Sequence, residues 1–363
     1  MLSHSADKLL LLLVGVCVAG GFLILASASM VISYKQFGTA SFYILRQFLY
    51  GGILGGMSFA ATQWIPYRFW RKAALPLMIV SFILMALLFI PEISYVAGGA
   101  RRWLKIGSFS FQPSEFLKLA FVIYLASWLD ARRKEVGSIS YGMAPFSLML
   151  GIVGIFLAMQ PDIGTLGVIV ATAGMLYFLG GGRISQIIML VALGLTAFFF
   201  LVQLAPYRME RVMVFLHPGS DPRGSGYQIT QATIAIGSGG FLGQGFGRSL
   251  QKYSYLPEPT GDSIFAVFAE EMGFLGAAVL VGLLGVLFWR GLSIAKRAPD
   301  SFGKLLAAGI ALNVMIQAFI NMAAISGMLP LTGIPLPFVS YGSTSLVVTL
   351  SAMGILVNVS KYT

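Results

Sequence analysis

Apolar segments of roughly 20 residues recur along the whole chain and are separated by short polar stretches. A helix of that length, rising 1.5 Å per residue, crosses a hydrocarbon core of roughly 30 Å. The pattern predicts an all-α polytopic membrane protein with about ten transmembrane helices. We place them near residues 9–29, 44–65, 75–91, 113–130, 143–160, 163–181, 184–204, 262–289, 303–327 and 337–360.

Two connectors are much longer than the others. One covers residues 92–111, and the other covers residues 205–261 between the seventh and eighth helices. Connectors of this length in a compact domain usually carry function. We expect a single transmembrane domain over residues 1–363, with 205–261 as a large extracytoplasmic loop.

Lysine and arginine gather in alternate short loops. Such clusters mark the cytoplasmic side of a membrane protein, so we predict that both termini are cytoplasmic and that the two long connectors face outward. The basic residues are Arg68, Arg71, Lys72, Arg132, Arg133, Lys134, Arg183, Arg290, Lys296 and Arg297.

Composition agrees with a bilayer environment, because 57% of the residues are hydrophobic and only 10% are charged. Too few polar side chains remain to cover a water-soluble surface. The net charge of +11 is then explained by basic residues that face anionic head groups, and no nucleic-acid partner is expected. Cys17 is the one cysteine, which excludes a disulfide within the chain.

Asp262 lies where the long outer loop enters the eighth predicted helix. An aspartate at this position can cap the helix, because its carboxylate accepts hydrogen bonds from the first N–H groups. A carboxylate beside a large outer loop can equally act as a general base. Both interpretations remain open on the residues alone.

Other charged residues lie at the ends of predicted helices. Glu115 and Lys118, three residues apart, share one helical face and form either a structural ion pair or part of a polar groove. Asp162 either caps the sixth helix or adds a second carboxylate to that groove, where it could bind a divalent cation such as Mg or Mn. We predict that Glu115, Lys118, Asp162 and Asp262 line one groove that faces outward.

Two further sets of polar residues lie inside predicted helices. Glu270 and Glu271 point about 100° apart, so they cannot form one paired-carboxylate site, and structural pairing is expected. Asn313, Gln317 and Asn321 recur every fourth residue and form a polar stripe. The stripe suits hydrogen bonding between helices or the wall of a cavity.

An ordered series of motifs resembles the SEDS proteins of shape, elongation, division and sporulation, the family of FtsW, RodA and SpoVE. The motifs are GARRW at 99–103, QPSEFLK at 112–118, QPDIGT at 160–165, GSGYQITQ at 224–231, AIGSGG at 235–240, YLPEPTGDSIFAVFAEEMGF at 255–274 and GIPLPFVSYGSTS at 333–345. Tyr207-Arg208 with Arg211, and Gln251-Lys252 ahead of Tyr255, look more like FtsW than like RodA. Many relatives have His-Thr-Asp-Phe around the aspartate where this chain has Thr260-Gly261-Asp262-Ser263, but the aspartate is kept.

The resemblance implies a peptidoglycan glycosyltransferase that polymerises lipid II at the outer face of the bacterial cytoplasmic membrane. Asp262 matches the family's essential aspartate and would deprotonate the acceptor hydroxyl, with undecaprenyl pyrophosphate as the leaving group. A class B penicillin-binding protein, which is a transpeptidase, and other divisome or elongasome membrane proteins are the implied partners. We assign substrate binding to Arg102, Gln112, Ser114, Glu115, Lys118, Asp162, Arg208, Arg211 and Ser340, with Asp162 as the candidate metal ligand.

Two other functions are compatible with the same residues. A lipid II flippase would use the groove for translocation and would need a continuous polar path that includes the Asn313 face. A non-catalytic divisome scaffold would only position the transpeptidase, and it would tolerate loss of both features.

Overall fold

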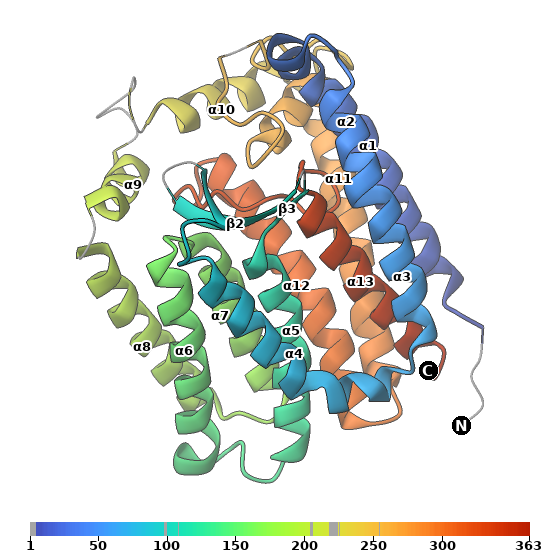
Figure 1. Cartoon of the computed structure of the whole chain (residues 1–363), viewed down its shortest axis with the longest axis vertical. Coiled ribbons are helices and arrows are strands. Elements are labelled where there is room, and N and C mark those ends of the chain that lie inside the picture. The colour runs from blue at the N-terminus through green and yellow to red at the C-terminus, as the bar shows by residue number, and fades with distance from the viewer. Residues whose placement is uncertain are drawn as a thin grey trace.

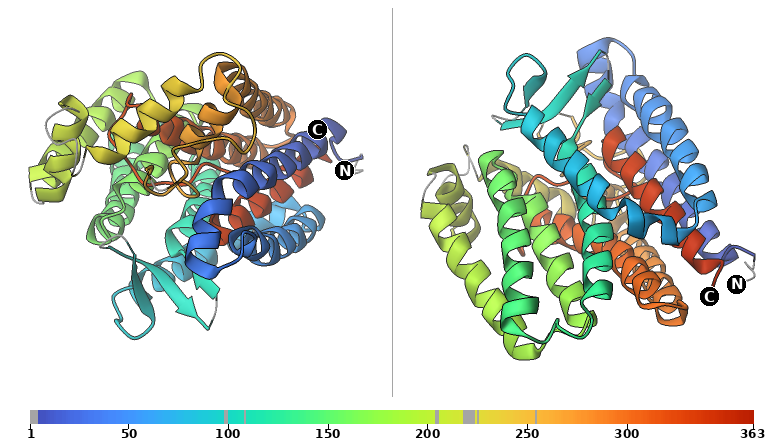
Figure 2. Two further views of the ribbon diagram at one scale, coloured as in Figure 1. Left: turned by 90° about the horizontal axis from the view of Figure 1, so that it is seen from above. Right: turned by 60° about the horizontal axis from the view of Figure 1, so that its bottom comes forward.

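The computed structural model describes residues 5–97, 100–107, 109–203, 206–217, 224, 226–253 and 255–363. Its helices form one bundle, with the two termini together at one end (Figures 1 and 2). The helices are α1 (Lys8–Phe37), α2 (Phe42–Arg46), the π-helix η1 (Gln47–Ile53), α3 (Leu54–Trp64), α4 (Tyr67–Leu87), α5 (Pro113–Ala131), the π-helix η2 (Ile139–Met143), α6 (Ala144–Met159), α7 (Ile163–Leu179), α8 (Ile184–Gln203), α9 (Pro206–Leu216), α10 (Tyr227–Ser238), α11 (Ile264–Arg297), α12 (Ser301–Ile325) and α13 (Ser343–Ser360). The strands are β1 (Ser94–Ala97), β2 (Ala100–Ile106) and β3 (Phe109–Phe111).

Each predicted apolar segment overlaps a helix or a continuous run of helices, which confirms the multi-pass helical fold. Among the described residues, seven helices are long and apolar enough to cross a membrane by length and composition: α1, α4, η2 with α6, α8, α11, α12 and α13. The count of about ten spans and the sidedness stay predictions. Both termini do share one end, because the Asp7 N–H donates to Ser360 Oγ at 3.2 Å.

The two long connectors contain more structure than the sequence predicts. The connector 92–111 contains the three strands, which form an antiparallel sheet in the order β1-β2-β3, and in this sheet Leu104 pairs with Phe111. These strands are too short to stand out beside long apolar helices, so the all-α prediction missed them. The connector 205–261, part of which lies outside the described residues, contains α9 and α10. The sheet, α9 and α10 lie at the end of the bundle away from the termini (Figure 1).

The last predicted span is wrong at its start, because α13 begins at Ser343 and not near residue 337. Pro335 and Pro337 lack the N–H groups that a helix interior uses, and Phe338 has a φ of 66°, which ends any helical run. Residues 331–342 therefore form an irregular segment, which we call the 331–342 segment. Gly21 of α1 lets it approach closely, since a Cβ there would lie 2.1 Å from the Phe338 carbonyl oxygen.

The centre of the bundle is formed by α12 and α13, which are 72% and 78% buried over their most apolar windows, whereas α8 at the edge is 6% buried. Small residues allow neighbouring helices to pack closely on α12. A Cβ on Gly309, for example, would lie 2.7 Å from Val122 of α5 and 2.8 Å from Leu176 of α7. The polar stripe of α12 is thus held in a fixed position at the core.

α11 is interrupted at Gly273, whose φ is 65°. The interruption exposes backbone groups that pair with the loop after α10. Phe274 N–H donates to the Gly240 carbonyl at 2.9 Å, and Gly245 N–H donates to the Glu271 carbonyl at 2.9 Å. This pairing ties the part of the chain that leads to Asp262 against the first turns of α11.

Glu270 and Glu271 are both buried and form the structural contacts that the sequence predicts. Glu271 pairs with Lys252 at 2.7 Å and accepts a hydrogen bond from Ser27 Oγ of α1 at 2.7 Å. Glu270 accepts the N–H of Leu250 at 2.9 Å. These contacts join α1, the loop after α10 and α11.

We expect Glu271→Ala to lower the free energy of unfolding by about 3–5 kcal/mol, because it leaves the Lys252 ammonium buried without its partner. Denaturant unfolding of the purified protein in detergent measures this change. The control is Glu135→Ala, which removes an ion pair with Arg132 whose side chains are 54% and 43% exposed; it should cost about 1 kcal/mol or less. Equal, small effects of both substitutions would contradict a structural role for Glu271.

Candidate functional site

Asp262 lies on the turn that precedes α11, at the end of the bundle that carries α10 and the sheet. Its side chain is partly exposed, and Oδ1 accepts a hydrogen bond from Gln228 Nε2 of α10 at 3.1 Å. Ser263 Oγ donates to the same oxygen at 3.4 Å. The other carboxylate oxygen faces Gly333, since a Cβ on that glycine would lie 3.8 Å from it.

The surroundings raise the pKa of Asp262 from 3.8 to about 6. Burial is the largest cause, and the negative charge of Glu258 adds to it, whereas Gln228, Arg211 and Ser263 act in the opposite direction. A carboxylate with a pKa near neutrality is a stronger proton acceptor than an ordinary aspartate and is still ionised at pH 7. The site therefore suits a general base.

The capping interpretation of Asp262 is wrong for this structure. Ser263 occupies the N-cap position of α11, and among the described residues no backbone N–H donates to the Asp262 carboxylate. Asp162, by contrast, does cap its helix, because its Oδ1 accepts the N–H of Thr165 in α7 at 3.2 Å. Asp162 and Asp262 both lie just before a helix, but only Asp162 caps its helix.

The polar stripe of α12 fixes the backbone around Asp262. Asn321 Nδ2 donates to the carbonyl oxygens of Asp262, at 2.9 Å, and of Ile334, at 2.8 Å. Gln317 Nε2 donates to the Pro335 carbonyl at 2.9 Å. The stripe binds backbone carbonyls of two loops, and these contacts hold the turn that carries Asp262 against the 331–342 segment.

Ser340 adds a further link between the same segments. Its Oγ donates to the Gly261 carbonyl at 2.7 Å and accepts the N–H of Leu336 at 2.8 Å. Because the hydroxyl is buried and engaged in both directions, Ser340 positions the Asp262 turn and does not face the surface. Its assignment to substrate binding is replaced by this positioning role.

Glu115 and Lys118 form a buried ion pair at 2.8 Å, with 2% and 4% of their side chains exposed. The Lys118 ammonium also donates to Gln317 Oε1. The pair lines a small cavity of about 20 Å³ between α5, α12 and α13, and Asp262 does not reach this cavity. The prediction of one groove shared by these residues is therefore wrong, and both charges of the pair are neutralised inside the protein.

Asp162, Ser114, Gln112 and Arg102 form a separate cluster where α5, α7 and the sheet meet. Ser114 Oγ donates to Asp162 Oδ2 at 3.0 Å, and Gln112 Nε2 donates to Ser114 Oγ at 3.2 Å. Arg102 Nε donates to the Gln160 carbonyl at 3.2 Å, and its Nη2 donates to the Pro161 carbonyl. The cluster holds β2 against the loop between α6 and α7.

The residues around Asp162 do not fit a divalent cation. Both of its oxygens accept hydrogen bonds, the Arg102 guanidinium holds the neighbouring carbonyls, and Ca²⁺ or Mg²⁺ sites need several oxygen ligands. Within the described residues, no three His, Cys, Asp or Glu side chains come together as a metal site.

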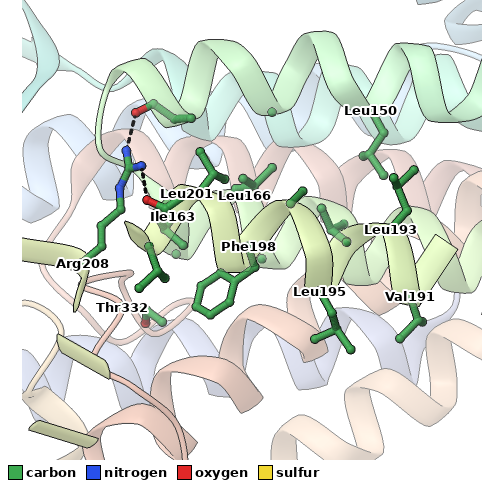
Figure 3. A pocket seen from close by; sticks show the side chains of 18 of the residues that line it. Leu150, Ile163, Leu166, Val191, Leu193, Leu195, Phe198, Leu201, Arg208 and Thr332 are labelled. Atoms are coloured by element: carbon green, nitrogen blue, oxygen red, sulfur yellow. Dashed lines mark hydrogen bonds between the residues drawn. The ribbon is translucent and has the colours of Figure 1, made fainter. Parts of the chain in front are cut away.

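A large apolar cavity of about 730 Å³ lies beside this region, between α6, α7 and α8. Figure 3 shows Leu150, Leu166, Leu193 and Phe198 among the side chains that line it. Arg208 of α9 closes one end by donating to the carbonyls of Leu201 and Ala158, both at 2.8 Å (Figure 3). The cavity suits an apolar chain, with cationic groups at its rim.

Arg211 connects this rim to the turn that carries Asp262. Its Nη1 donates to the Leu331 carbonyl at 2.9 Å, it lines the cavity, and its positive charge lowers the pKa of Asp262. The rim of the cavity and the carboxylate are thus close enough to interact electrostatically. A molecule with an apolar tail, an anionic linker and a polar head could occupy the cavity, the arginines and the Asp262 region at once.

Sequence reasoning missed two residues that set the properties of Asp262. Gln228 lies in GSGYQITQ and Glu258 in YLPEPTGD, so the motifs marked both, but only the fold shows that they face the same carboxylate. Glu258 also has a φ of 49°, and such backbone strain in a non-glycine residue is concentrated at functional sites. Gly99, Ser225 and the side chain of Tyr207, which belong to the motifs above, lie outside the described residues.

Known proteins are similar to this chain in sequence over nearly its whole length. A family model described as "Cell cycle protein", for FtsW, RodA and SpoVE, matches residues 7–363. The chain is similar to stage V sporulation protein E of Bacillus subtilis (strain 168), with 42% identity over 99% of this chain and 98% of that protein. It is also similar to the probable peptidoglycan glycosyltransferase FtsW of Geobacter sp. (strain M18), with 38% identity over 98% and 96%. These identities are too close to separate the members of the family, so the greater likeness to FtsW stays a prediction.

The fold is similar to a solved structure that reports structural coordination of polymerization and crosslinking by a peptidoglycan synthase complex. The TM-score is 0.79 with 31% identity, over 98% of this chain and 97% of that one. The likeness therefore extends to the whole bundle.

Because Glu258 and Gln228 act on the Asp262 carboxylate in opposite directions, we expect Glu258→Gln to lower its pKa and Gln228→Leu to raise it. Removing a negative neighbour favours the ionised form, and removing a donor disfavours it. A pH titration of the carboxylate band by infrared difference spectroscopy, with Asp262→Asn identifying the band, measures both shifts. Glu92→Gln, in the exposed connector before β1, is the control. Shifts of the same sign in Glu258→Gln and Gln228→Leu would contradict the described geometry.

Proposed function

Since the chain belongs to the FtsW, RodA and SpoVE family of cell cycle proteins, we propose that it is a peptidoglycan glycosyltransferase. It polymerises lipid II into glycan strands at the outer face of the bacterial cytoplasmic membrane, for cell division or elongation. One observation carries the proposal: a carboxylate with a pKa raised to about 6 lies next to the arginine rim of an apolar cavity. The name of the Geobacter relative supports the same reaction class.

The proposed reaction is a direct displacement. Asp262 accepts the proton of the N-acetylglucosamine 4-hydroxyl of the acceptor, and the oxygen forms a bond to the anomeric carbon of the donor's N-acetylmuramic acid. The bond from that carbon to the pyrophosphate oxygen breaks, and undecaprenyl pyrophosphate leaves with the electron pair. Displacement from the opposite face converts an α-linked donor into a β-linked glycan.

The arginines beside the cavity are suited to the leaving group. A pyrophosphate that gains negative charge is stabilised by guanidinium groups, which offer several donors in a planar arrangement. Arg208 and Arg211 lie at the rim of the apolar cavity, so the pyrophosphate binds there while the nearest part of the lipid tail occupies the cavity. Arg102 of β2, whose guanidinium donates to the Gln160 and Pro161 carbonyls, is a further cation near Pro161, which lines the cavity.

The interior of the helix bundle gives less support to a flippase that translocates lipid II. The polar residues inside the bundle, including Glu115, Lys118 and Asn313, surround a cavity of only about 20 Å³, which is room for a single water molecule. The Glu115 and Lys118 charges are paired with each other and are not free to contact a passing head group. We therefore favour chemistry at the outer end over passage through the centre.

We propose a class B penicillin-binding protein as the working partner, together with other divisome or elongasome membrane proteins. The similar solved structure concerns a complex that couples polymerization to crosslinking, and a strand released near Asp262 would reach a transpeptidase on the same side of the membrane. In this arrangement the protein would also position the transpeptidase, as a scaffold does, in addition to joining the sugars itself.

Asp262→Asn should lower the rate of lipid II polymerisation by about 100-fold or more, because the amide cannot accept the proton. The thermal stability should stay close to that of the wild type, since the amide oxygen can still accept the hydrogen bond from Gln228. The assay follows labelled lipid II with purified protein, with and without the cognate class B penicillin-binding protein.

Asp300→Asn is the matched control. Asp300 caps α12 through the Gly303 N–H at 2.7 Å, and α12 starts at the opposite end of the bundle from the sheet and α10 (Figure 1). This variant should polymerise lipid II at close to the wild-type rate. A near-wild-type rate in Asp262→Asn would eliminate the catalytic assignment.

A further inference from the structure

A cluster of three tyrosines lies beside the catalytic turn and has no part in the reaction proposed above. The rings of Tyr43 in α2 and Tyr341 in the 331–342 segment meet edge to face, with centroids 4.9 Å apart. Tyr95 of β1 interacts electrostatically with both of their hydroxyls. Tyr95 is 49% exposed, and the other two are partly exposed, so the cluster presents aromatic surface to the outside.

The cluster is tied directly to the Asp262 turn. Tyr341 N–H donates to the Thr260 carbonyl at 2.8 Å, and Thr260 precedes Asp262 by only two residues, which is at most about 7 Å of chain. The negative charge of Glu258 acts on both Asp262 and Tyr43. The tyrosines are therefore within reach of a molecule that reacts at Asp262 and extends by one more unit.

The tyrosine cluster is held rigidly by contacts behind it. Gln47 Oε1 of η1 accepts the N–H of Gly342 at 3.1 Å, which joins α2 and η1 to the start of α13. Tyr43 donates its hydroxyl to Gln36 Oε1 at 2.7 Å and packs against Phe42, 5.8 Å between ring centroids. Because these side chains are ordered before any ligand arrives, binding costs less conformational entropy.

The chemistry of the surface selects one class of ligand. Both the negative charge of Glu258 and the positive charge of Arg46 act on Tyr43. Arg46 also acts on Tyr341, so the cluster has polar groups of both signs around its rings. The lipid tail already has the apolar cavity between α6, α7 and α8. A sugar ring has an apolar C–H face that packs on an aromatic ring and a polar edge that hydrogen-bonds phenol and carboxylate oxygens. Partly exposed tyrosines beside a carboxylate match both features.

We propose that Tyr43, Tyr95 and Tyr341 form a sugar-binding subsite for the unit of the glycan strand next to the pair of sugars that react at Asp262. The proposal rests on the proposed glycosyl transfer, since that reaction brings the strand to this turn. Binding at the subsite keeps the strand in register between successive additions. The tyrosines are positioning residues and take no part in bond formation.

The first test measures sugar binding without catalysis. The probe is chitotetraose, whose β-1,4-linked backbone has the geometry of a glycan strand, and the protein is the full-length Asp262→Asn variant in lipid nanodiscs. Saturation-transfer NMR and calorimetry should show that Tyr43→Ala and Tyr341→Ala each weaken binding about 2- to 10-fold. Tyr43→Phe keeps the ring and should bind within about twofold of the parent.

Tyr141→Ala is the matched control, because Tyr141 is 64% exposed and lies in η2, far from the tyrosine cluster in the bundle. Its affinity for chitotetraose should equal that of the parent. Thermal melting excludes unfolded variants, and the rescue by Tyr43→Phe separates a lost ring from a lost fold. Absence of chitotetraose binding in the parent, or binding unchanged by Tyr43→Ala and Tyr341→Ala, would overturn the proposal.

A second readout uses the catalytically active chain. Tyr43→Ala should shorten the glycan strands made from lipid II, whereas Tyr43→Phe should give strands of wild-type length. Tyrosine-dependent chitotetraose binding in a protein that does not polymerise lipid II would contradict the proposed function and leave the subsite standing. Strands of wild-type length from Tyr43→Ala, with binding also unchanged, would remove the subsite and leave the transferase standing.

Discussion

The amide of Asn321 connects the core of the bundle to its chemistry. Two hydrogen bonds from this one side chain hold the carbonyls of Asp262 and Ile334, so the turn before α11 and the 331–342 segment share a single anchor on α12. The anchor is buried on one of the two most enclosed helices, where an unpaired carbonyl would be costly. Together with Gln317, which holds the Pro335 carbonyl of the same segment, it fixes the turn that carries Asp262 and the segment that carries Ser340 and Tyr341 on the core.

A carboxylate, an apolar cavity and an aromatic surface lie at separate places around this anchor. Asp262 is buried enough to hold a raised pKa, the apolar cavity and its arginines lie on one side, and the tyrosine cluster lies beside the catalytic turn through Thr260. The ion pair of Glu271 and Lys252 secures the loop that approaches from α10. In the proposed function, a lipid-linked sugar would meet an apolar, a cationic and a proton-accepting region in the order of its own chemical groups.

Long apolar periodicity predicted the helices well, because spans of this length leave few alternatives in a bilayer. It failed where local chemistry decides the structure. The short strands around Leu104 and the irregular segment at Pro335 and Pro337 are determined by pairing partners and by missing N–H groups. Helices α9 and α10 lie in a stretch where the sequence shows motifs but no apolar segment long enough to predict a span.

In the candidate site, too, the sequence predicts some features and only the fold decides others. The sequence identified Asp262 and Asp162 as equivalent choices between cap and function, and only the positions of Thr165, Gln228 and Ser263 distinguish them. For Glu115 and Lys118 the sequence left open a structural ion pair and a polar groove, because charges in membrane helices usually face a polar cavity. The structure shows the ion pair, which three-residue spacing allows but does not require.

The central claim is that ionised Asp262 accepts the proton of the acceptor hydroxyl. The most direct test is the initial rate of lipid II polymerisation by the wild-type protein between about pH 5 and pH 8, with folding monitored at each pH. The rate should fall on the acid side with a midpoint near the pKa of about 6 of Asp262, because the protonated carboxyl cannot act as a base. A rate that stays constant through this midpoint in a folded protein would contradict the assignment of Asp262 as the base.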